Sequence, residues 1–395
     1  MKKLPWGTRN KLSDDELYGR EKEISNIKSL LYSTEYANAP EILFTGVRGV
    51  GKTVFLNKIK EQLNEEGYLS ILIDFSTSQS YQREHLTVTG IMKHYYKEII
   101  KQSNKKGINL LTTRLKKYFK TKNFEIKDIT TANSIQIPLI ASEDDEASLM
   151  DFVLNLPQKI YEENQDKIKG VIILIDEFQI IKELNDYLNS FLWILRGHIQ
   201  NHNNVAYIIT GSMGMEDQLI YDIASQEGAF GGRIITQQLT PFDENTTKKY
   251  LNEKAPYLEF TQESFERFYK CTSGIPYYVN TLANLLPTNE TIKKEDIIDT
   301  FDNNISYMIK YLVNIWIKLS NKEKDIIITL IDKPLKRKEI SKKLETQSGS
   351  LSIYFKKLTE LNLITNNNGT YLIKEEMLKR WLELEYAKNE CYPYR

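Results

Sequence analysis

The stretch GVRGVGKT, from Gly46 to Thr53, decides the fold of this chain. It fits the pattern G-x-x-x-x-G-K-[ST] at every fixed position, with Gly51 and Lys52 as its second glycine and its lysine. The apolar run EILFTG (41–46) precedes the loop, and apolar residues at helical spacing follow it. A strand, a glycine loop and a helix in this order predict a P-loop that holds nucleotide phosphates, rather than a glycine-rich turn without a ligand.

The chemistry of such a loop assigns roles to its residues. Its backbone N–H groups surround phosphate oxygens, and the N-terminus of the following helix adds positive charge. We expect Lys52 to reach the β- and γ-phosphates and Thr53 to bind Mg²⁺. The residues expected to hold the nucleotide are Gly46, Val47, Arg48, Gly49, Val50, Gly51, Lys52, Thr53 and Val54.

Further apolar runs predict the sheet that carries this loop. Three runs, at 68–75, 170–178 and 205–212, are rich in Ile, Leu and Val, as strands covered on both faces are. Between the last two runs, residues 184–200 predict a helix with one aliphatic face. Repeated alternation of strand and helix predicts an α/β fold with a parallel sheet.

Residues 78–165 interrupt this alternation. They are rich in Lys, Asn and Tyr and are too long for a bare loop, so they predict an insertion that is mainly helical. After one more expected strand at 234–242, the chain reads as helical to about residue 318. We therefore expect an N-terminal extension over 1–16, a P-loop core over 17–240 and a helical lid over 241–318.

The pattern changes again from residue 319 onward. Three short helices are expected, from NKEKDIIITLID, KRKEISKKL and SGSLSIYFKKLTELN. LITNNNGTYLI then predicts two strands around an Asn-rich turn closed by Gly369. Three helices followed by a hairpin are the order of a winged helix, which we expect over 319–385, with a tail over 386–395.

A second element supports nucleotide chemistry. The buried run VIILIDE ends in Asp176 and Glu177, where a strand of a parallel sheet reaches the edge at which ligands bind. We expect Asp176 to hold Mg²⁺ and Glu177 to orient and deprotonate an attacking water. An acidic pair at a strand end is otherwise often solvated, but the P-loop favours the catalytic interpretation.

These motifs, in this order, resemble a known family. LYGREKEI, GVRGVGKT, LIDEFQ, IITGS, GGRI before LTPF, and SGIPYYVN, followed by the expected winged helix, are similar to STAND-type, AAA+-related P-loop ATPases of archaea and bacteria. The resemblance covers the chain from about Tyr18 to about Trp381. It implies an AAA+-like fold with a helical lid and a winged helix, and hydrolysis of ATP to ADP and phosphate.

The resemblance also implies roles at the entry and in the lid. Gly19 and Arg20 of YGRE match the family's entry motif near the adenine and ribose, although a surface turn is the alternative. Gly274 and Pro276 of SGIP match the G-x-P element, by which the lid packs against the nucleotide. An ordinary helix-start proline is the alternative for Pro276.

Three more residues are implied to act at the γ-phosphate. Thr210 and Ser212 of TGS stand where the family places a polar sensor, and a strand-end turn competes with this reading. Arg233 of GGRI matches the family's arginine before the last strand. Its guanidinium would neutralise charge on the transferred phosphoryl group, in its own subunit or in a neighbour during nucleotide-dependent self-association.

The expected winged helix is rich in cations. Around its second and third helices, Lys336, Arg337, Lys338, Lys356 and Lys357 are candidates for DNA phosphate contacts. The third helix has no arginine or asparagine with which to read base edges, so recognition of a DNA sequence is not supported. The alternatives, which together weigh the same, are docking to a protein partner, a lid over the ATPase and a cationic face that is only solvated.

The composition limits the remaining function classes. Lys+Arg and Asp+Glu number 53 each, so there is no overall attraction to nucleic acid. No apolar run is long enough to span a bilayer and no signal peptide is visible, so we expect a cytoplasmic protein without membrane contact. Cys271 and Cys391 lack metal-site spacing, and the pair His198 and His202 reads as a solvated helix end.

Two functions remain. The first is an ATP-hydrolysing switch that couples its nucleotide state to a partner or to DNA. The second is a P-loop kinase for a small molecule, which has no use for a water-activating Glu177. GTP is disfavoured because the chain has no N-K-x-D motif.

Overall fold

A computed structural model describes residues 17–83, 85–108, 125–127, 137–139, 145–211, 218–288, 290–361 and 363–394. The predicted N-terminal extension, much of the stretch 109–144 and Ser212 lie outside these residues. The chain divides into two compact units between Thr240 and Pro241. Within the described residues, no helix is both long and apolar enough to cross a membrane.

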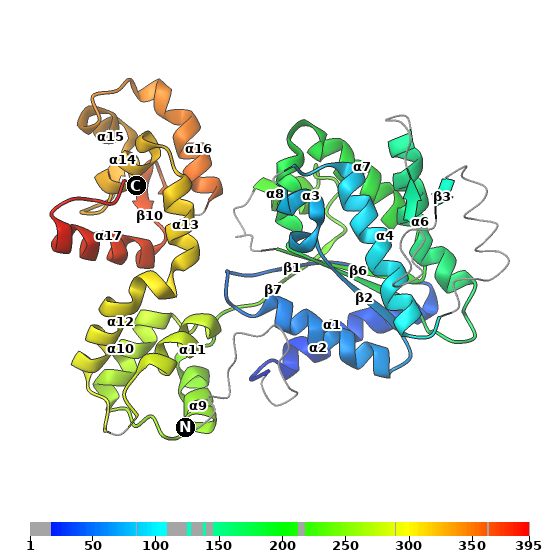
Figure 1. Cartoon of the computed structure of the whole chain (residues 1–395), viewed down its shortest axis with the longest axis horizontal. Helices are drawn as coiled ribbons and strands as arrows, with labels where there is room; N and C mark the ends of the chain where they lie inside the picture. Colours follow the sequence, from blue (N-terminus) through cyan, green and yellow to red (C-terminus); the bar gives the residue numbers. More distant parts are fainter. Residues whose placement is uncertain are drawn as a thin grey trace. The chain divides into compact units, whose positions relative to one another are not determined.

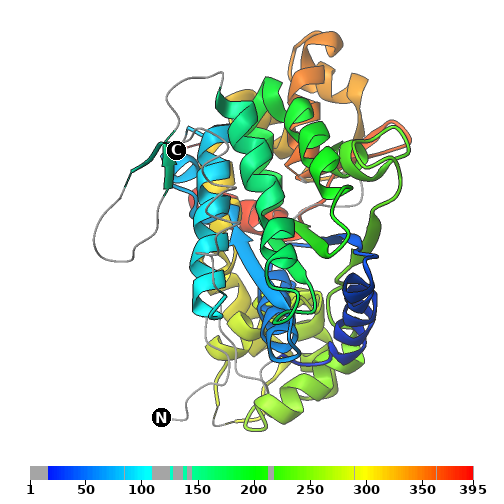
Figure 2. The same cartoon turned by 90° about the vertical axis from the view of Figure 1, so that its right-hand side faces the viewer.

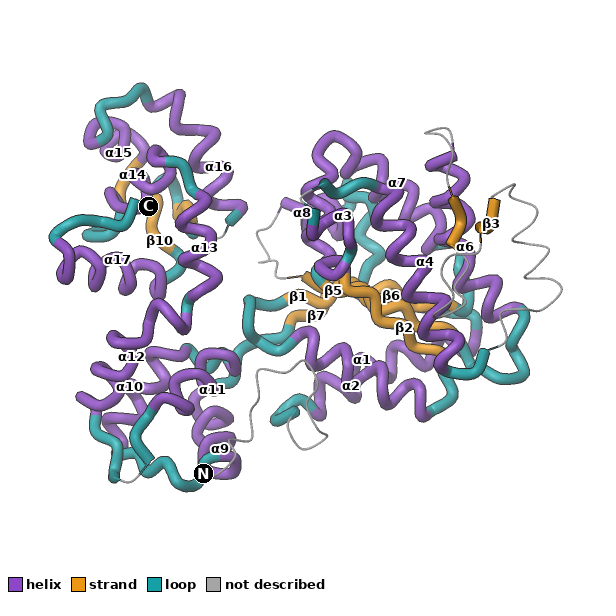
Figure 3. The backbone as a smooth tube through the Cα atoms, viewed as in Figure 1, coloured by secondary structure: helices purple, strands orange, loops and turns teal. Residues whose placement is uncertain are grey.

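The first unit is built on a five-stranded parallel sheet, drawn in orange in Figure 3. Its strands lie in the order β2 (Leu69–Asp74), β5 (Val171–Asp176), β6 (Val205–Gly211), β1 (Glu41–Thr45) and β7 (Ile235–Gln238). The four apolar runs are thus strands, as predicted. β7 confirms the last expected strand in a shorter form.

Two layers of helices cover this sheet (Figure 1). One face carries α1 (Glu21–Leu31) and α2 (Lys52–Glu65), and the other carries α4 (Val88–Lys105), α6 (Asp145–Glu162) and α7 (Leu188–Ile199). Successive strand residues bury opposite faces: Ile173 and Ile175 pack under the second layer, and Ile172 and Leu174 pack on the first. Strands buried on both sides explain the unbroken apolar runs.

The predicted insertion contributes to this second layer. Of the stretch 78–165, the structure describes α3 (Gln79–Gln82), α4, α6 and two short antiparallel strands, β3 (Glu125–Lys127) and β4 (Ile137–Leu139). Helices α4 and α6 lie side by side in both views (Figures 1 and 2) and share the main core with the sheet. These helices are therefore part of the wall of the P-loop core.

One helix begins later than predicted. Residues Phe178–Tyr187 form a 3₁₀ segment, η3, and α7 starts only at Leu188. The cause is Asn185, whose φ of 49° and ψ of −114° interrupt the helical path. The predicted aliphatic face nevertheless packs on the core: Leu184, Leu192, Leu195 and Ile199 are buried, and Leu188 is partly buried.

The second unit starts as a helical bundle. Its helices are α9 (Glu244–Lys254), α10 (Gln262–Thr272), α11 (Pro276–Leu285), α12 (Lys294–Met308) and α13 (Lys310–Lys318). This matches the helical content predicted up to residue 318. Gly274, with φ of 65°, precedes α11, and a Cβ there would lie 1.9 Å from the Phe242 carbonyl oxygen. Only glycine fits this contact.

The end of the second unit contains the predicted helices and hairpin. They are α14 (Asn321–Thr329), α15 (Arg337–Lys343), α16 (Ser352–Glu360), β9 (Ile364–Asn367) and β10 (Thr370–Ile373). Asn368 and Gly369 have φ of 52° and 85°, as the two-residue turn of a hairpin requires. Two elements were not predicted: β8 (Leu335–Lys336), which pairs with β10, and α17 (Glu376–Asn389), which crosses the limit drawn at residue 385.

Candidate active site

The glycine loop joins the end of β1 to the start of α2, as the sequence predicts. Gly51 has φ of 101° immediately before α2, and Gly49 has φ of 82°. At Gly46, an added Cβ would lie 2.7 Å from the Leu239 carbonyl oxygen, a distance that Cβ atoms essentially never adopt. Left-handed dihedrals at two positions and a close backbone contact at the third explain why the loop needs glycine.

Lys52 lies inside the loop. Its side chain is buried, and Nζ donates to the carbonyl oxygens of Gly46 at 2.8 Å and Val47 at 3.1 Å. Burial lowers the pKa of Lys52 to about 8, although the nearby carboxylates of Glu177 and Asp176 oppose this change. The ammonium group is thus held against loop carbonyls by bonds that phosphate oxygens can replace.

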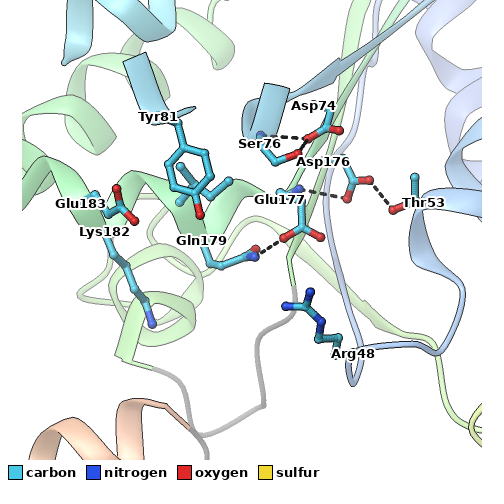
Figure 4. A pocket seen from close by; sticks show the side chains of 11 residues that line it. Arg48, Thr53, Asp74, Ser76, Tyr81, Asp176, Glu177, Gln179, Lys182 and Glu183 are labelled. Carbon is cyan, nitrogen blue, oxygen red and sulfur yellow. Dashed lines mark hydrogen bonds between the residues drawn. The ribbon is translucent and has the colours of Figure 1, made fainter. Parts of the chain in front are cut away.

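Asp176 accepts hydrogen bonds from several residues of the site (Figure 4). It is buried at the end of β5, and its two carboxylate oxygens accept hydrogen bonds from different elements. Thr53 Oγ1, on α2, donates to Oδ2 at 2.6 Å, and Thr210 Oγ1, on β6, donates to Oδ1 at 2.5 Å. The structure therefore brings Asp176 together with Thr53, 123 positions before it, and Thr210, 34 positions after it. Ser212 lies outside the described residues.

Glu177, the next residue after Asp176, lines a cavity beside the glycine loop. Its φ of 53° is left-handed, which is unusual for a residue with a Cβ and costs about 1 kcal/mol. Burial first, and then the Asp176 carboxylate, raise the pKa of Glu177, while a hydrogen bond from Gln179 Nε2 to Oε2 lowers it. Lys52 and Arg48 add further positive charge. Glu177 is thus an acid with a raised pKa beside the phosphate loop, as a general base requires.

A cavity of about 560 Å³ opens in front of these residues. Its walls come from the glycine loop, from the end of β5 with η3, and from the segment that follows β2 (Figure 4). The lining residues are Arg48, Thr53, Asp74, Ser76, Tyr81, Asp176, Glu177, Gln179, Ile180, Lys182 and Glu183. Seven of these were not predicted from the sequence: Asp74, Ser76, Tyr81, Gln179, Ile180, Lys182 and Glu183.

A signal for one of these residues is present in the sequence. The tetrapeptide Ile-Leu-Ile-Asp occurs twice, ending in Asp74 and in Asp176. The two copies are paired residue for residue between β2 and β5. Asp74 uses its carboxylate to accept from Ser76 N at 2.9 Å and Ser76 Oγ at 2.6 Å, which fixes the turn after β2.

The entry motif is bound to the end of the first unit. Arg20 is buried, and its guanidinium donates to the Thr240 carbonyl oxygen at 2.7 Å and to Glu23 Oε1 at 3.2 Å. Gly19, with φ of 62°, makes the turn before α1. The structure thus gives Arg20 a partner in the chain itself, and the predicted role of both residues toward adenine or ribose stays a prediction.

Arg233 lies at the end of the sheet where β1 and β7 begin, opposite the end that carries the glycine loop. It precedes β7, whose residue Ile235 pairs with Ile42 at the start of β1, whereas the glycine loop follows the end of β1. Together with Arg196 it opposes the rise in the pKa of Glu41 that burial causes. The five residues of β1 span roughly 16 Å, so Arg233 does not reach the loop of its own chain. The predicted role of Arg233 toward the γ-phosphate, in its own subunit or in a neighbour, stays a prediction.

The other predicted residues lie elsewhere. Pro276 is the first residue of α11 and belongs, with Gly274, to the second unit. Val50 is buried under the loop, and Val54 is part of the first turn of α2. Helix α11 begins at a proline in the manner of many helices, so the predicted contact of Pro276 with nucleotide stays a prediction.

The predicted DNA-contacting cations form two groups. Arg337 Nε donates to the Ser348 carbonyl oxygen at 2.8 Å, and Lys357 lies 2.9 Å from the carboxylate of Glu323. These two cations stabilise the packing of α15, α16 and α14. Lys336 and Lys338 are exposed, as are Lys356 and Lys357 on α16.

The histidine pair contrasts with the prediction. His202 is buried rather than solvated, and its Nδ1 lies 2.9 Å from the Tyr207 hydroxyl. Burial lowers the pKa of His202 to about 4, with a further contribution from His198. Among the described residues no group of His, Cys, Asp and Glu has a metal-binding arrangement, and Cys271 and Cys391 are free thiols.

Comparisons with known proteins agree with this geometry. The model of the ATPase_2 family, an ATPase domain predominantly from Archaea, matches residues 17–282. The Walker-type ATPase PABY2304 of Pyrococcus abyssi is similar in structure, with a TM-score of 0.65 and 20% identity over 95% of this chain and 99% of that chain. The ORC2 protein of Aeropyrum pernix, in its ADPNP-ADP complexes, has a TM-score of 0.51 and 13% identity over 95% and 96%. At these identities the likeness concerns the fold, and a comparison with curated proteins found no match.

Proposed function

The chain belongs to the ATPase_2 family of ATPase domains, and we propose that it is a molecular switch of the STAND type. In such a switch, ATP hydrolysis would change the conformation of the second unit. Binding of ATP and ADP and the P-loop fold follow from the family. The observation that carries the catalytic part is the joint bonding of Thr53 and Thr210 to Asp176, with Glu177 adjacent.

The donor set at Asp176 fits a magnesium ion. The Thr53 hydroxyl and the Asp176 carboxylate lie 2.6 Å apart, and both are hard oxygen ligands of the kind Mg²⁺ prefers. These two residues would hold the ion, which when bound neutralises charge on the β- and γ-phosphate oxygens. Thr210 keeps the Asp176 carboxylate in place from the opposite side.

The chain's own residues account for the hydrolysis step. Lys52 exchanges its loop carbonyls for phosphate oxygens. The Glu177 carboxylate accepts a proton from a water molecule, whose oxygen forms a bond to the γ-phosphorus. The bond from that phosphorus to the bridging oxygen breaks, and ADP leaves with the electron pair. The raised pKa of Glu177 makes it a stronger base than an exposed glutamate.

Leu239 and Thr240 connect the glycine loop to the start of the second unit. Gly46 of the loop contacts Leu239, and Leu239 N donates to the carbonyl oxygen of Thr45 at 2.8 Å. Thr240, the next residue, is held by Arg20, and the second unit begins immediately after it. A change in the glycine loop therefore acts on the segment that leads into the second unit.

The end of the second unit would be the output. We infer a winged helix from α14, α15 and α16 with the hairpin β9–β10. Helix α17, which follows the hairpin, is joined to the helical bundle by an ion pair. Arg380 on α17 lies 2.5 Å from the carboxylate of Asp302 on α12. Lys336, Lys338 and Lys356 are exposed and would contact DNA phosphates.

The catalytic proposal is tested by Glu177→Gln. With this variant we expect unchanged ATP affinity and phosphate release lowered by roughly 100-fold or more, as loss of a general base predicts. The surface variant Glu21→Gln is the control. A small-molecule kinase would instead retain phosphate transfer to its acceptor, so undiminished turnover of ATP by Glu177→Gln would contradict a water-activating role.

The output is tested on the full chain. Spin labels on Cys391 and on an introduced Lys22→Cys, both exposed, report distances between the units in ATP-bound Glu177→Gln and in the ADP form. We expect different distance distributions, and identical ones contradict the switch. DNA affinity should fall steeply with salt and drop further in Lys336→Ala/Lys338→Ala. If no salt-sensitive DNA affinity exists, the protein-docking alternative takes its place.

A further inference from the structure

Gln179 is a cavity residue that the catalytic account above does not use. It lies in the first turn of η3, two residues after Glu177, and its Nε2 donates a hydrogen bond to Glu177 Oε2 (Figure 4). Phe178 between them is fully buried, whereas Glu177 and Gln179 both line the cavity. Figure 4 shows the Glu177 and Gln179 side chains meeting at this hydrogen bond.

The backbone that carries Gln179 is firmly held. The Phe178 ring is fully buried and packs against Phe75, with ring centroids 5.9 Å apart. Ile180 N donates to the Glu177 carbonyl oxygen at 3.1 Å, which closes the turn. An amide on so rigid a segment presents its donor at a fixed position, so it can direct a neighbouring carboxylate.

The carboxylate of Glu177 has competing attractions. The charges of Lys52 and Arg48 both act on it, and an ion pair with Lys52 would remove the base and the phosphate-binding ammonium together. Asp176 repels it from the other side. A neutral amide resolves this conflict, because it holds the carboxylate by a hydrogen bond without neutralising it.

We propose that Gln179 is a positioning residue for ATP hydrolysis, which holds the Glu177 carboxylate toward the attacking water and away from Lys52. The assignment rests on the proposed role of Glu177 as the base.

The test compares Gln179→Met, which keeps the length of the side chain but has no donor, with Gln82→Met on the exposed end of α3. For Gln179→Met we expect kcat to fall roughly tenfold with KM for ATP within about twofold, since only the orientation of the base is lost. Gln82→Met should match the unmodified protein.

Two further variants keep the outcomes distinct. Gln179→Glu retains the shape but replaces the donor by a carboxylate that repels Glu177, so its kcat should fall at least as far as that of Gln179→Met. In the Glu177→Gln background, Gln179→Met should cost nothing more, because both residues act through one group. If Glu177→Gln is inactive while Gln179→Met and Gln179→Glu keep the original kcat, the assignment of Gln179 is overturned. If Glu177→Gln itself hydrolyses normally, the proposed base is overturned instead.

Discussion

Asp74 and Asp176 are register partners on neighbouring strands, and each ends the same four-residue sequence. Their side chains nevertheless have different hydrogen-bond partners. Asp176 accepts from Thr53 and Thr210 and joins three elements at the phosphate loop. Asp74 accepts from Ser76 and closes the turn toward α3. An identical local sequence thus places a carboxylate at the phosphate loop on the interior strand β5 and closes a turn on the edge strand β2.

This difference predicts unequal effects of the same substitution. Asp176→Asn should lower magnesium-dependent hydrolysis by roughly 100-fold or more, because a charged ligand is lost where phosphate charge is neutralised. Asp74→Asn should retain most of the activity and lower stability by about 0.5–1 kcal/mol, as weakening of a turn-capping carboxylate does. Steady-state hydrolysis and urea unfolding of both variants provide the measurement, and equal loss of activity would contradict the division of tasks.

Two glycine-to-alanine substitutions in the first unit are expected to change the free energy of unfolding in opposite directions. Gly46→Ala places a Cβ 2.7 Å from the backbone oxygen of Leu239, so the loop or the segment before the second unit must shift. We expect a loss of about 1–3 kcal/mol and weaker ATP binding. Gly197→Ala, inside α7 with nothing within 4 Å of the new methyl group, should raise stability by about 0.5–1 kcal/mol.

Both variants are measured by chemical denaturation of the full chain. A neutral Gly46→Ala would mean that the contact between the loop and Leu239 is not constrained. The proposed route from the nucleotide to the second unit would then lose its first step.

Lys52 predicts the pH dependence of nucleotide affinity. Its pKa of about 8 in the free protein lies well below that of an exposed lysine because the side chain is buried. Only the protonated ammonium attracts a triphosphate, so the Kd for ATP should be constant below pH 7 and rise by up to about tenfold per pH unit above pH 8. Calorimetric titrations from pH 6.5 to pH 9.5 measure it.

Lys52→Arg is the matched variant, since a guanidinium remains charged over this range. Its affinity is expected to be lower throughout and flat with pH. A rise in Kd of the same slope in both proteins would assign the titration to another group.

Local patterns in the sequence were sufficient for the strands, the glycine loop and the acidic pair, because each depends on residues within one segment. Contacts between segments were harder to predict. The run 68–75 is predicted as a strand, but its pairing with β5 depends on contacts between segments, so Asp74 could not be recognised as a neighbour of Asp176. The register of β7 places Arg233 near the start of β1, which the sequence alone does not show. The bond between Gln179 and Glu177 depends on a 3₁₀ turn, for which apolar periodicity gives no signal.

His202 predicts a loss of stability in mild acid. In the unfolded chain a histidine binds a proton near pH 6.5, whereas in the fold burial lowers the pKa of His202 to about 4. Between these values the unfolded state binds more protons, so the free energy of unfolding rises with pH and is lost as the pH falls from about 6.5 toward 4, by up to about 3 kcal/mol. His202→Gln retains a polar side chain near Tyr207 and should remove most of this slope, whereas the exposed His85→Gln should leave it unchanged. Urea unfolding at pH 5 and pH 7 measures the difference, and an equal slope in the unmodified protein and His202→Gln would show that carboxylates, not the buried imidazole, set the acid limit.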